Sequence, residues 1–310
     1  EVPALGQGTR VRKHGLAPPL PDDWRRGDEG EPRTLRGAGL GLFGLRPVPV
    51  VGRDEERSAL WEVLSRVHTT RRPHGVIISG APGTGKSRLV SWLSERAEEV
   101  GGAILFKATH SQPMTYADGL VAMMTRFTRT QGLGFEEVLM RVRSLYSDLD
   151  LRGEDILFDA VALTERILGL IPENASGPRF QSRREWFSAL LRVLGALTRE
   201  RPVLLWLDDV HCSTESLEFA HYILSHQDDD TYPLCVVCTV PDLLESDAAL
   251  TRLEAVEALD NVEQLDLEPL SDEEMRDLVG RMLGLSSALA ELVVERTAGS
   301  PLFAVQLVED

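Results

Sequence analysis

Residues 80–87 read Gly80-Ala81-Pro82-Gly83-Thr84-Gly85-Lys86-Ser87, and they lie between an apolar run and a segment with helical periodicity. The closely spaced glycines allow consecutive backbone N–H groups to curve around a polyphosphate. The N-terminus of the helix that follows adds a favourable dipole. The spacing Gly-x-x-x-x-Gly-Lys-Ser therefore predicts a phosphate-binding loop that connects a strand to a helix.

Two side chains of this loop are expected to act directly on a bound nucleotide. Lys86 is expected to reach the β- and γ-phosphates, and Ser87 is expected to bind Mg²⁺. A glycine-rich turn with a solvated lysine is the alternative, but it does not explain why the motif falls between a strand and a helix. The expected cofactors are ATP or ADP and Mg²⁺. The residues predicted to bind the nucleotide are Gly80, Pro82, Gly83, Thr84, Gly85, Lys86, Ser87 and Arg88.

A second apolar run ends in two acids, Asp208 and Asp209. An ATPase with such a loop needs a carboxylate at the end of a neighbouring strand for Mg²⁺, and a second acid to orient the attacking water. Since an unpaired carboxylate at a buried strand end is costly, we assign Asp208 to Mg²⁺ and Asp209 to the water. The alternative is that both acids cap the helix that follows, over residues 213–225.

Thr239 ends the next apolar run and is expected to contact the γ-phosphate or the lytic water. We therefore place it with Lys86, Asp208 and Asp209 among the catalytic candidates. Threonine also favours strands for its own conformational reasons, so an ordinary structural role is the alternative.

Five apolar runs are expected to be strands, and they alternate with helical patterns. Such alternation implies a mostly parallel sheet that helices cover on both faces. The predicted fold class is α/β: a three-layer P-loop NTPase sandwich with a five-stranded sheet, a helical insertion and a truncated C-terminal helical lid. The expected strands are Val76–Ser79, Ala103–Ala108, Val203–Leu207, Leu234–Thr239 and Val262–Leu267.

Three regions are expected along the chain. Residues 1–48 are a Gly/Pro-rich linker, residues 49–270 form the ATPase core, and residues 271–310 begin the lid. Helical patterns between about 116 and 200, including 135–149, 156–170 and 183–198, form the insertion. Ser271 and Glu274 have the spacing of a capping box, which starts the first lid helix.

The linker shows no sustained periodicity, so a solvated tether is the favoured interpretation. Its mildly basic character against an acidic body makes docking onto that body the alternative. The residues expected to be able to pack on the next domain are Leu40, Leu42, Phe43 and Leu45.

The net charge of the 310-residue chain is −16. A chain of this charge repels phosphate backbones and anionic lipid, so nucleic acid is not the expected partner of this segment. No apolar run approaches the 18 or so residues that span a bilayer, so we expect a soluble protein without a membrane partner.

The three cysteines, Cys212, Cys235 and Cys238, are too few for a disulfide framework. A reducing cytoplasm is the expected location. Cys235 and Cys238 match Cys-x-x-Cys, but residues three apart on a strand point to opposite faces. We therefore expect small core side chains rather than a redox or zinc site.

Four segments, in their order along the chain, resemble the STAND/AAA-type signalling ATPases. The resemblance is closest to the AAA ATPase modules that are fused to bacterial serine/threonine kinases, adenylate cyclases or LuxR-type regulators. It covers about residues 49–310. The segments are Val51–Glu56, Gly80–Ser87, Leu207–His211 and Gly299–Phe303.

The resemblance implies further site residues. In that family a Val-Gly-Arg segment lines the adenine pocket, which makes Val51, Gly52 and Arg53 candidates here. A Gly-x-Pro segment contacts the nucleotide from the lid, which would place Pro301 over the base. The family also implies that nucleotide exchange and hydrolysis switch the module between closed and open states.

Two departures from the family pattern bear on hydrolysis. Residues 212–214 are Cys-Ser-Thr where the family usually has Trp-Ala-Asp, and Val-Pro follows Thr239 where the family often has an arginine. Such an arginine is typically worth about 10³–10⁵ in rate, so slow hydrolysis is expected. The remaining sources of this arginine are Arg183, Arg184, Arg296 and a neighbouring subunit.

An ATP-dependent switch in a larger bacterial signalling protein is the leading functional hypothesis. The chain begins at Glu1 rather than Met and ends within a helical pattern, so we expect further domains, such as a kinase or cyclase upstream and helical repeats downstream. A nucleotide-dependent homo-oligomer is a further expectation. The alternatives are a nucleotide-binding scaffold without turnover, a DNA-acting AAA+ ATPase of the origin-binding or helicase-loader type, and a small-molecule kinase.

Overall fold

The computed structural model describes residues 19–25, 50–169, 179–225, 232–244, 246–283 and 287–309. The strands are β1 (His74–Ser79), β2 (Ile104–Thr109), β3 (Val203–Asp208), β4 (Leu234–Thr239) and β5 (Val262–Asp266). The helices are α1 (Asp54–Thr70), α2 (Lys86–Glu99), α3 (Gly119–Thr128), α4 (Phe135–Asp148), α5 (Glu154–Ile167), α6 (Arg183–Leu197), α7 (Thr214–Ser225), α8 (Asp247–Glu257), α9 (Asp272–Leu283), α10 (Ser287–Thr297) and α11 (Pro301–Glu309).

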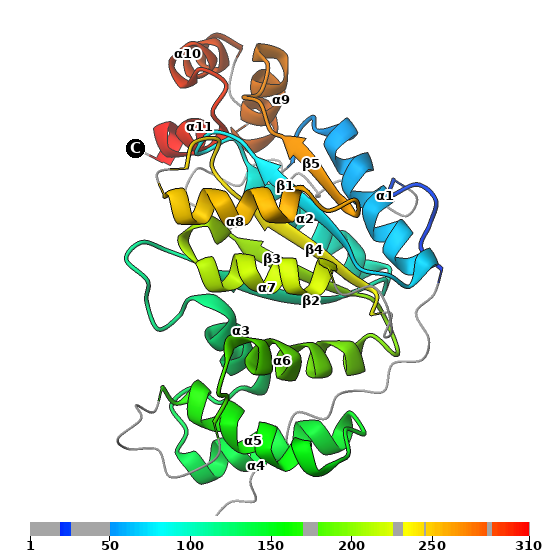
Figure 1. Ribbon diagram of the computed structural model, residues 1–310. Helices are drawn as coiled ribbons and strands as arrows, with labels where there is room; N and C mark the ends of the chain where they lie inside the picture. The colour runs from blue at the N-terminus through cyan, green and yellow to red at the C-terminus, as the bar shows by residue number, and fades with distance from the viewer. Residues whose placement is uncertain are drawn as a thin grey trace, which may run out of the picture.

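The five strands form one parallel sheet in the order β2-β3-β4-β1-β5 (Figure 1). Every residue of β3 and β4 is buried. Their sequences are continuously apolar because helices cover both faces of the sheet. The α/β fold with a five-stranded sheet is therefore confirmed.

The strand order changes one detail of the sequence prediction. The acids at the end of β3 were expected on a strand adjacent to the phosphate-binding strand, but β4 lies between β1 and β3. The carboxyl ends of parallel strands meet at the same edge of a sheet, so the end of β3 still faces the loop that follows β1.

Alternate residues of the strands build two cores, one on each face. Helices α1 and α2 cover the face that carries Ile78 and Trp206. Helices α3, α6, α7 and α8 cover the face that carries Ile77 and Leu205. This period of two follows from the alternation of side chains along each strand.

Cys235 and Cys238 show the same alternation. Cys235 packs in the core beneath α1 and α2, whereas Cys238 packs in the core on the opposite face. Burial raises the pKa of each thiol to about 12. Both are small core side chains, as the sequence predicts.

Helices α3–α6 form the insertion between β2 and β3, and α4 and α5 lie beyond α6 from the sheet (Figure 1). Their boundaries fall within a few residues of the predicted ranges. Buried side chains such as Val142, Leu163 and Trp186 extend the core beneath α6 into this region.

Helices α9–α11 form the lid at one end of the molecule (Figure 1). They have a core of their own, which includes Met275, Leu278 and Ala304. The predicted capping box is present: the Ser271 amide donates to the Glu274 carboxylate at 2.8 Å, and the Glu274 amide donates to Ser271 Oγ at 3.3 Å.

The described part of the predicted linker, residues 19–25, docks onto the core. The Trp24 side chain is 4% exposed and packs edge-on against Trp92 of α2 at 5.1 Å between ring centroids. Trp61 Nε1 donates to the Pro21 carbonyl at 2.9 Å, and Arg96 Nε donates to the Trp24 carbonyl at 2.9 Å. The favoured interpretation as a solvated tether is therefore wrong for this segment. The predicted packing residues between 40 and 45 lie outside the described residues.

Candidate nucleotide-binding site

Residues 80–85 connect β1 to α2, and two of their glycines are required by close contacts. Gly80 has φ +148°, and a Cβ there would come within 2.5 Å of the Leu267 carbonyl oxygen. Gly83 has φ +85°, and a Cβ there would lie 2.8 Å from Ser300 Oγ. Such φ values favour glycine, so the backbone takes the curved path that a phosphate-binding loop needs.

The Lys86 side chain is folded into this loop. Its Nζ donates to the carbonyl oxygens of Gly80 at 2.5 Å and Ala81 at 3.0 Å. Desolvation lowers the pKa of Lys86, and the acids at the sheet edge oppose that shift. The ammonium therefore lies inside the loop, where a phosphate can replace the carbonyls as its partner.

The Asp208 carboxylate joins three elements at the carboxyl edge of the sheet. Its Oδ1 accepts from Ser87 Oγ of α2 at 2.8 Å and from Thr239 Oγ1 of β4 at 2.9 Å. Its Oδ2 pairs with Lys107 Nζ of β2 at 3.0 Å. The structure thus brings together Ser87 and Asp208, the two residues predicted to bind the metal.

Asp209 follows directly and adopts φ +50°, so its exposed side chain leaves the line of the strand. Partial desolvation at the sheet edge, and then the negative charge of Asp208, raise the pKa of its carboxyl. A raised pKa makes a carboxylate a better proton acceptor. Asp209 is therefore suited to hold a water molecule in front of the loop.

Thr239 contacts both acids at the end of β3. Its side chain is fully buried, and its hydroxyl donates to Asp208 Oδ1 while it accepts from the Asp209 amide at 2.9 Å. The donor and one acceptor position of the hydroxyl are used by the two acids. The geometry assigns Thr239 a positioning role.

Two residues at this edge were missed by the sequence reasoning. Lys107 contacts Asp208, and buried His110 contacts the Asp208 carbonyl oxygen through Nδ1 at 2.7 Å and Ser216 Oγ through Nε2 at 2.8 Å. Burial lowers the pKa of His110, which favours the neutral form of the ring. Lys107 and His110 lie at this edge because β2 pairs with β3. No local sequence motif reveals that pairing.

The donor set fits Mg²⁺. Ser87 and Asp208 supply the hard oxygen ligands that Mg²⁺ prefers, and the ion usually completes its octahedral shell with phosphate oxygens and water. Within the described ranges no cluster of three or more His, Cys, Asp or Glu could hold a metal ion. A metal at this pair would complete its shell with phosphate oxygens of a nucleotide and with water.

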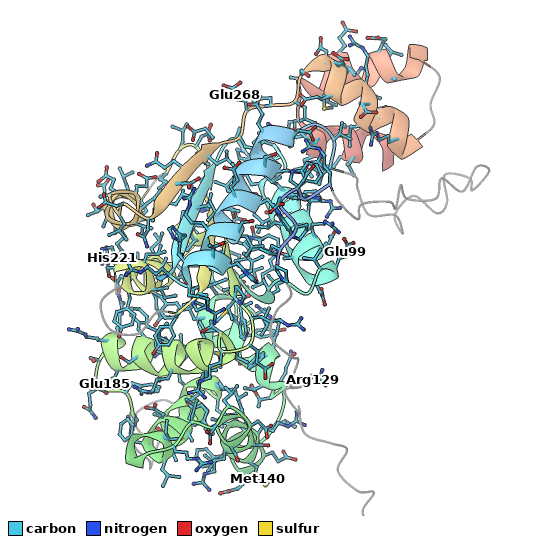
Figure 2. All side chains as sticks on the ribbon, turned by 90° about the vertical axis from the view of Figure 1, so that its right-hand side faces the viewer. Glu99, Arg129, Met140, Glu185, His221 and Glu268 are labelled. Carbon is cyan, nitrogen blue, oxygen red and sulfur yellow. The ribbon has the colours of Figure 1, made fainter. Side chains whose placement is uncertain are left out.

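The Val51–Arg53 segment lies where the core meets the lid. Val51 packs in the lid core, and a Cβ on Gly52 would collide with the Glu274 side chain of α9. The Arg53 guanidinium donates to the Thr84 carbonyl at 3.5 Å and to the Glu268 carbonyl. Figure 2 labels Glu268 at the crossing from the sheet to the lid helices. Arg53 thus ties the phosphate-binding loop to this crossing.

The start of α11 rests on the same loop. The Leu302 amide donates to the Gly83 carbonyl at 3.3 Å. Ser300 Oγ, which faces Gly83, is shielded from solvent and has no hydrogen-bond partner among the described residues. Pro301, the predicted base-contacting residue, is half-buried between these two.

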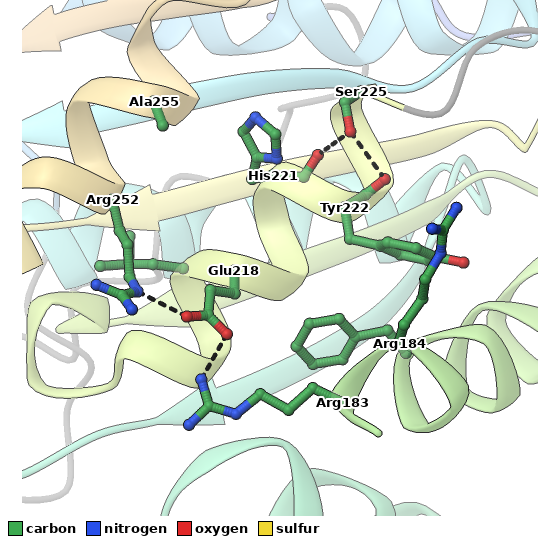
Figure 3. A pocket seen from close by; sticks show the side chains of 10 residues that line it. Arg183, Arg184, Glu218, His221, Tyr222, Ser225, Arg252 and Ala255 are labelled. Carbon is green, nitrogen blue, oxygen red and sulfur yellow. Dashed lines mark hydrogen bonds and ion pairs between the residues drawn. The ribbon is translucent and has the colours of Figure 1, made fainter. Parts of the chain in front are cut away.

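The remaining predicted arginines lie on α2, α6 and α10. Arg88 pairs with Glu95 along α2 at 2.8 Å, and Arg296 is exposed on α10. Arg183 and Arg184 line a groove of about 560 Å³ between α6, α7 and α8, which no residue of the phosphate-binding loop lines. There Glu218 pairs with Arg183 and Arg252 (Figure 3). The structure therefore does not bring Arg183 or Arg184 to the loop.

Residues 49–237 match the family model described as the AAA ATPase domain. The chain belongs to the AAA ATPase domain family. This match confirms the AAA ATPase part of the resemblance that the sequence motifs indicate. No curated protein matches this AAA ATPase domain.

Solved structures share the fold of this AAA ATPase domain. The ADP form of the ORC2 protein of Aeropyrum pernix matches with a TM-score of 0.50 and 15% identity, over 87% of this chain and 65% of that chain. Cdc6p of Pyrobaculum aerophilum matches with a TM-score of 0.50 and 16% identity, over 88% and 64%. A STAND protein with a tetratricopeptide repeat sensor from Pyrococcus horikoshii matches with a TM-score of 0.38 and 15% identity, over 86% and 30%.

The chain spans less than two thirds of the length of these proteins. At such identities the likeness to the ORC2 and Cdc6p structures shows the fold alone. In the part of the chain that the structure describes, no helix combines the length and apolar character needed to cross a membrane.

Proposed function

We propose that this chain binds ATP or ADP with Mg²⁺ at Gly80–Ser87 and works as a nucleotide-controlled switch in a larger bacterial regulatory protein. One observation carries the proposal: the Leu302 amide of the lid donates to the Gly83 carbonyl of the loop at 3.3 Å. A nucleotide that enters the loop must therefore meet the lid.

The loop supplies the grip on the phosphates. The backbone N–H groups that precede α2 and the dipole of that helix favour a polyphosphate. Lys86 adds a positive charge that leaves its carbonyl partners for the phosphates. Pro82, Thr84, Gly85 and Arg88 are proposed contacts of the same nucleotide, while Val51, Gly52, Arg53 and Pro301 are proposed to surround its base.

The acids supply the chemistry of hydrolysis. Mg²⁺, when bound by Ser87 and Asp208, neutralises phosphate charge. Asp209 holds and orients the attacking water and accepts its proton. Thr239 keeps the two acids in place. The γ-phosphate arginine is proposed to come from Arg296 or a neighbouring subunit. Hydrolysis is slow while that arginine is absent from the site.

Linkage explains how binding can work as a switch. A ligand at about 1,000 times its dissociation constant stabilises the state that binds it by about 4 kcal/mol. Residues 300–302 make few contacts with Gly83, and Gly83 belongs to the phosphate-binding loop. A nucleotide bound in this loop can therefore favour one lid position over another. ATP and ADP differ by the γ-phosphate, which gives the two lid states different affinities.

We propose a role for each region of the chain. Residues 1–48 connect the core to an upstream domain, such as a kinase or cyclase, with residues 19–25 anchored on the core. Residues 49–270 are the ATPase core, with the insertion at about 116–200, and residues 271–310 begin the lid. Helical repeats downstream, a nucleotide-dependent homo-oligomer and a cytoplasmic location complete the proposal.

A DNA-acting role is the main competing function. Its support is the fold shared with the ORC2 and Cdc6p structures. The net charge of −16 opposes it, because contacts with the phosphate backbone dominate the affinity for DNA. A scaffold that binds nucleotide without turnover would share the site but lack the hydrolytic step.

Isothermal titration calorimetry with Lys86→Ala tests the site. The wild-type chain should bind Mg²⁺·ATP and Mg²⁺·ADP, and Lys86→Ala should lose at least about 100-fold in affinity, about 2.8 kcal/mol. Arg66→Ala is the matched control, since Arg66 forms an exposed pair with Glu263. Equal ATP affinity of Lys86→Ala and the wild type would refute the site.

A further inference from the structure

Lys107 lies across Trp206 toward Asp208. Lys107 of β2 and Trp206 of β3 are paired in the sheet register, and Asp208 is two residues further along β3. The Lys107 Nζ lies 3.4 Å from the centroid of the Trp206 ring and 3.0 Å from Asp208 Oδ2. The aromatic face and the carboxylate together hold the ammonium at one place.

This ammonium completes the partners of the Asp208 carboxylate. Oδ1 accepts from Ser87 and Thr239, and Oδ2 pairs with Lys107. The Asp208 side chain is 12% exposed and that of Lys107 is 34% exposed. Because the pair is partly removed from water, its charges interact more strongly than those of a surface pair.

The residue type at this position stands out in the sequence. The chain has 33 lysines and arginines together, and only three of them are lysines. These are Lys13, Lys86 and Lys107. Two of the three lysines therefore lie at the proposed nucleotide site. A lysine ammonium is a compact point charge on a flexible stem. Such a side chain can move away from Asp208 when Mg²⁺ binds.

We propose that Lys107 is the counter-ion of Asp208 and that its ammonium pairs with this carboxylate when Mg²⁺ is absent. Lys107 thereby weakens the dependence of nucleotide binding on Mg²⁺. This rests on the proposed nucleotide site. Lys107 favours the bare triphosphate through its positive charge and disfavours a second cation beside Asp208. It is a positioning residue that acts through Asp208, and no step of hydrolysis needs it.

Removal of this charge should act on two dissociation constants in opposite senses. The bare nucleotide loses a nearby cation and should bind less tightly. The Mg²⁺ complex loses a repelling cation and should bind as tightly or more tightly. The ratio of the dissociation constant in EDTA to that in excess Mg²⁺ should therefore rise.

The experiment measures that ratio by equilibrium titration with a fluorescent ATP analogue. Lys107→Met should raise the ratio roughly tenfold, about 1.4 kcal/mol. Lys107→Gln is a second neutral variant with a polar end, in case Lys107→Met does not fold. Lys107→Arg keeps the charge and should raise the ratio less than Lys107→Met does. Arg66→Met removes a cation of similar exposure that pairs with Glu263, and it should leave the ratio unchanged.

The outcomes separate the two proposals. If the wild type binds nucleotide and the neutral variants keep its ratio, Lys107 does not act as the counter-ion, while the nucleotide site stands. If Arg66→Met shifts the ratio as much as Lys107→Met, the effect is a general loss of charge and the inference is refuted. If the wild type binds no nucleotide with or without Mg²⁺, the proposed function fails and this inference fails with it.

Discussion

Asp208 receives contacts from three elements that are far apart along the chain. Ser87 follows the loop, Thr239 ends β4 and Lys107 lies on β2. A carboxylate with this many partners is held in one orientation, which is what a metal ligand needs. The fully buried Thr239 hydroxyl also satisfies the Asp209 amide, so both acids depend on one small side chain.

The positioning role of Thr239 predicts an effect in the absence of nucleotide. Thr239→Val keeps the shape but leaves the Asp209 amide without its partner, which should cost about 1–3 kcal/mol of unfolding free energy. Thr239→Ser keeps the hydroxyl and should lower the unfolding free energy by less than Thr239→Val does. Urea unfolding of the nucleotide-free protein measures both. If the hydroxyl served only a phosphate, Thr239→Val would leave the stability of the nucleotide-free protein unchanged.

Local patterns in the sequence explain which part of the site could be predicted. The loop at 80–87 and the acids at 208–209 each stand in a short motif with its own chemistry. Lys107 and His110 have no motif, because their roles come from the pairing of β2 with β3. The role of Thr239 could not be predicted either, since its sequence position fits a phosphate contact and a contact with the acids equally well.

The elements themselves follow closely from local patterns. Strands β3 and β4 are continuous apolar runs that end in polar residues, so their bounds are set by burial. The strand order was not predictable in this way, because local periodicity is silent on which strands become neighbours. The docking of residues 19–25 was missed for a similar reason: a short segment without periodicity binds mainly through Trp24 and the Pro21 carbonyl.

The docked segment should contribute measurably to stability. Trp24 is 4% exposed, packs on Trp92 and donates to Ser58 Oγ at 3.2 Å. Trp24→Ala should therefore lower the unfolding free energy by about 3 kcal/mol. The control is Arg66→Ala, since Arg66 is 43% exposed in its pair with Glu263, and its loss should cost under about 1 kcal/mol. Thermal unfolding measures both variants. If Trp24→Ala left the unfolding free energy unchanged, residues 19–25 would be a tether.

At the scale of the whole molecule, the core and the lid meet around the phosphate-binding loop. Arg53 reaches both the Thr84 carbonyl of the loop and the Glu268 carbonyl at the crossing to the lid. The Leu302 amide reaches the Gly83 carbonyl. The lid has its own core, so it can move as one body. The proposed switch would therefore act on the lid through these few contacts.

Backbone amide hydrogen exchange of the lid tests the proposed switch most directly. Exchange over residues 300–309 should differ between the nucleotide-free protein, the Mg²⁺·ADP complex and the complex with Mg²⁺ and a non-hydrolysable ATP analogue, because each state meets residues 300–302 differently. Lys86→Ala should show one exchange pattern under all three conditions. Identical lid exchange in all three states of a wild-type protein that calorimetry shows to be loaded would contradict a nucleotide-controlled switch.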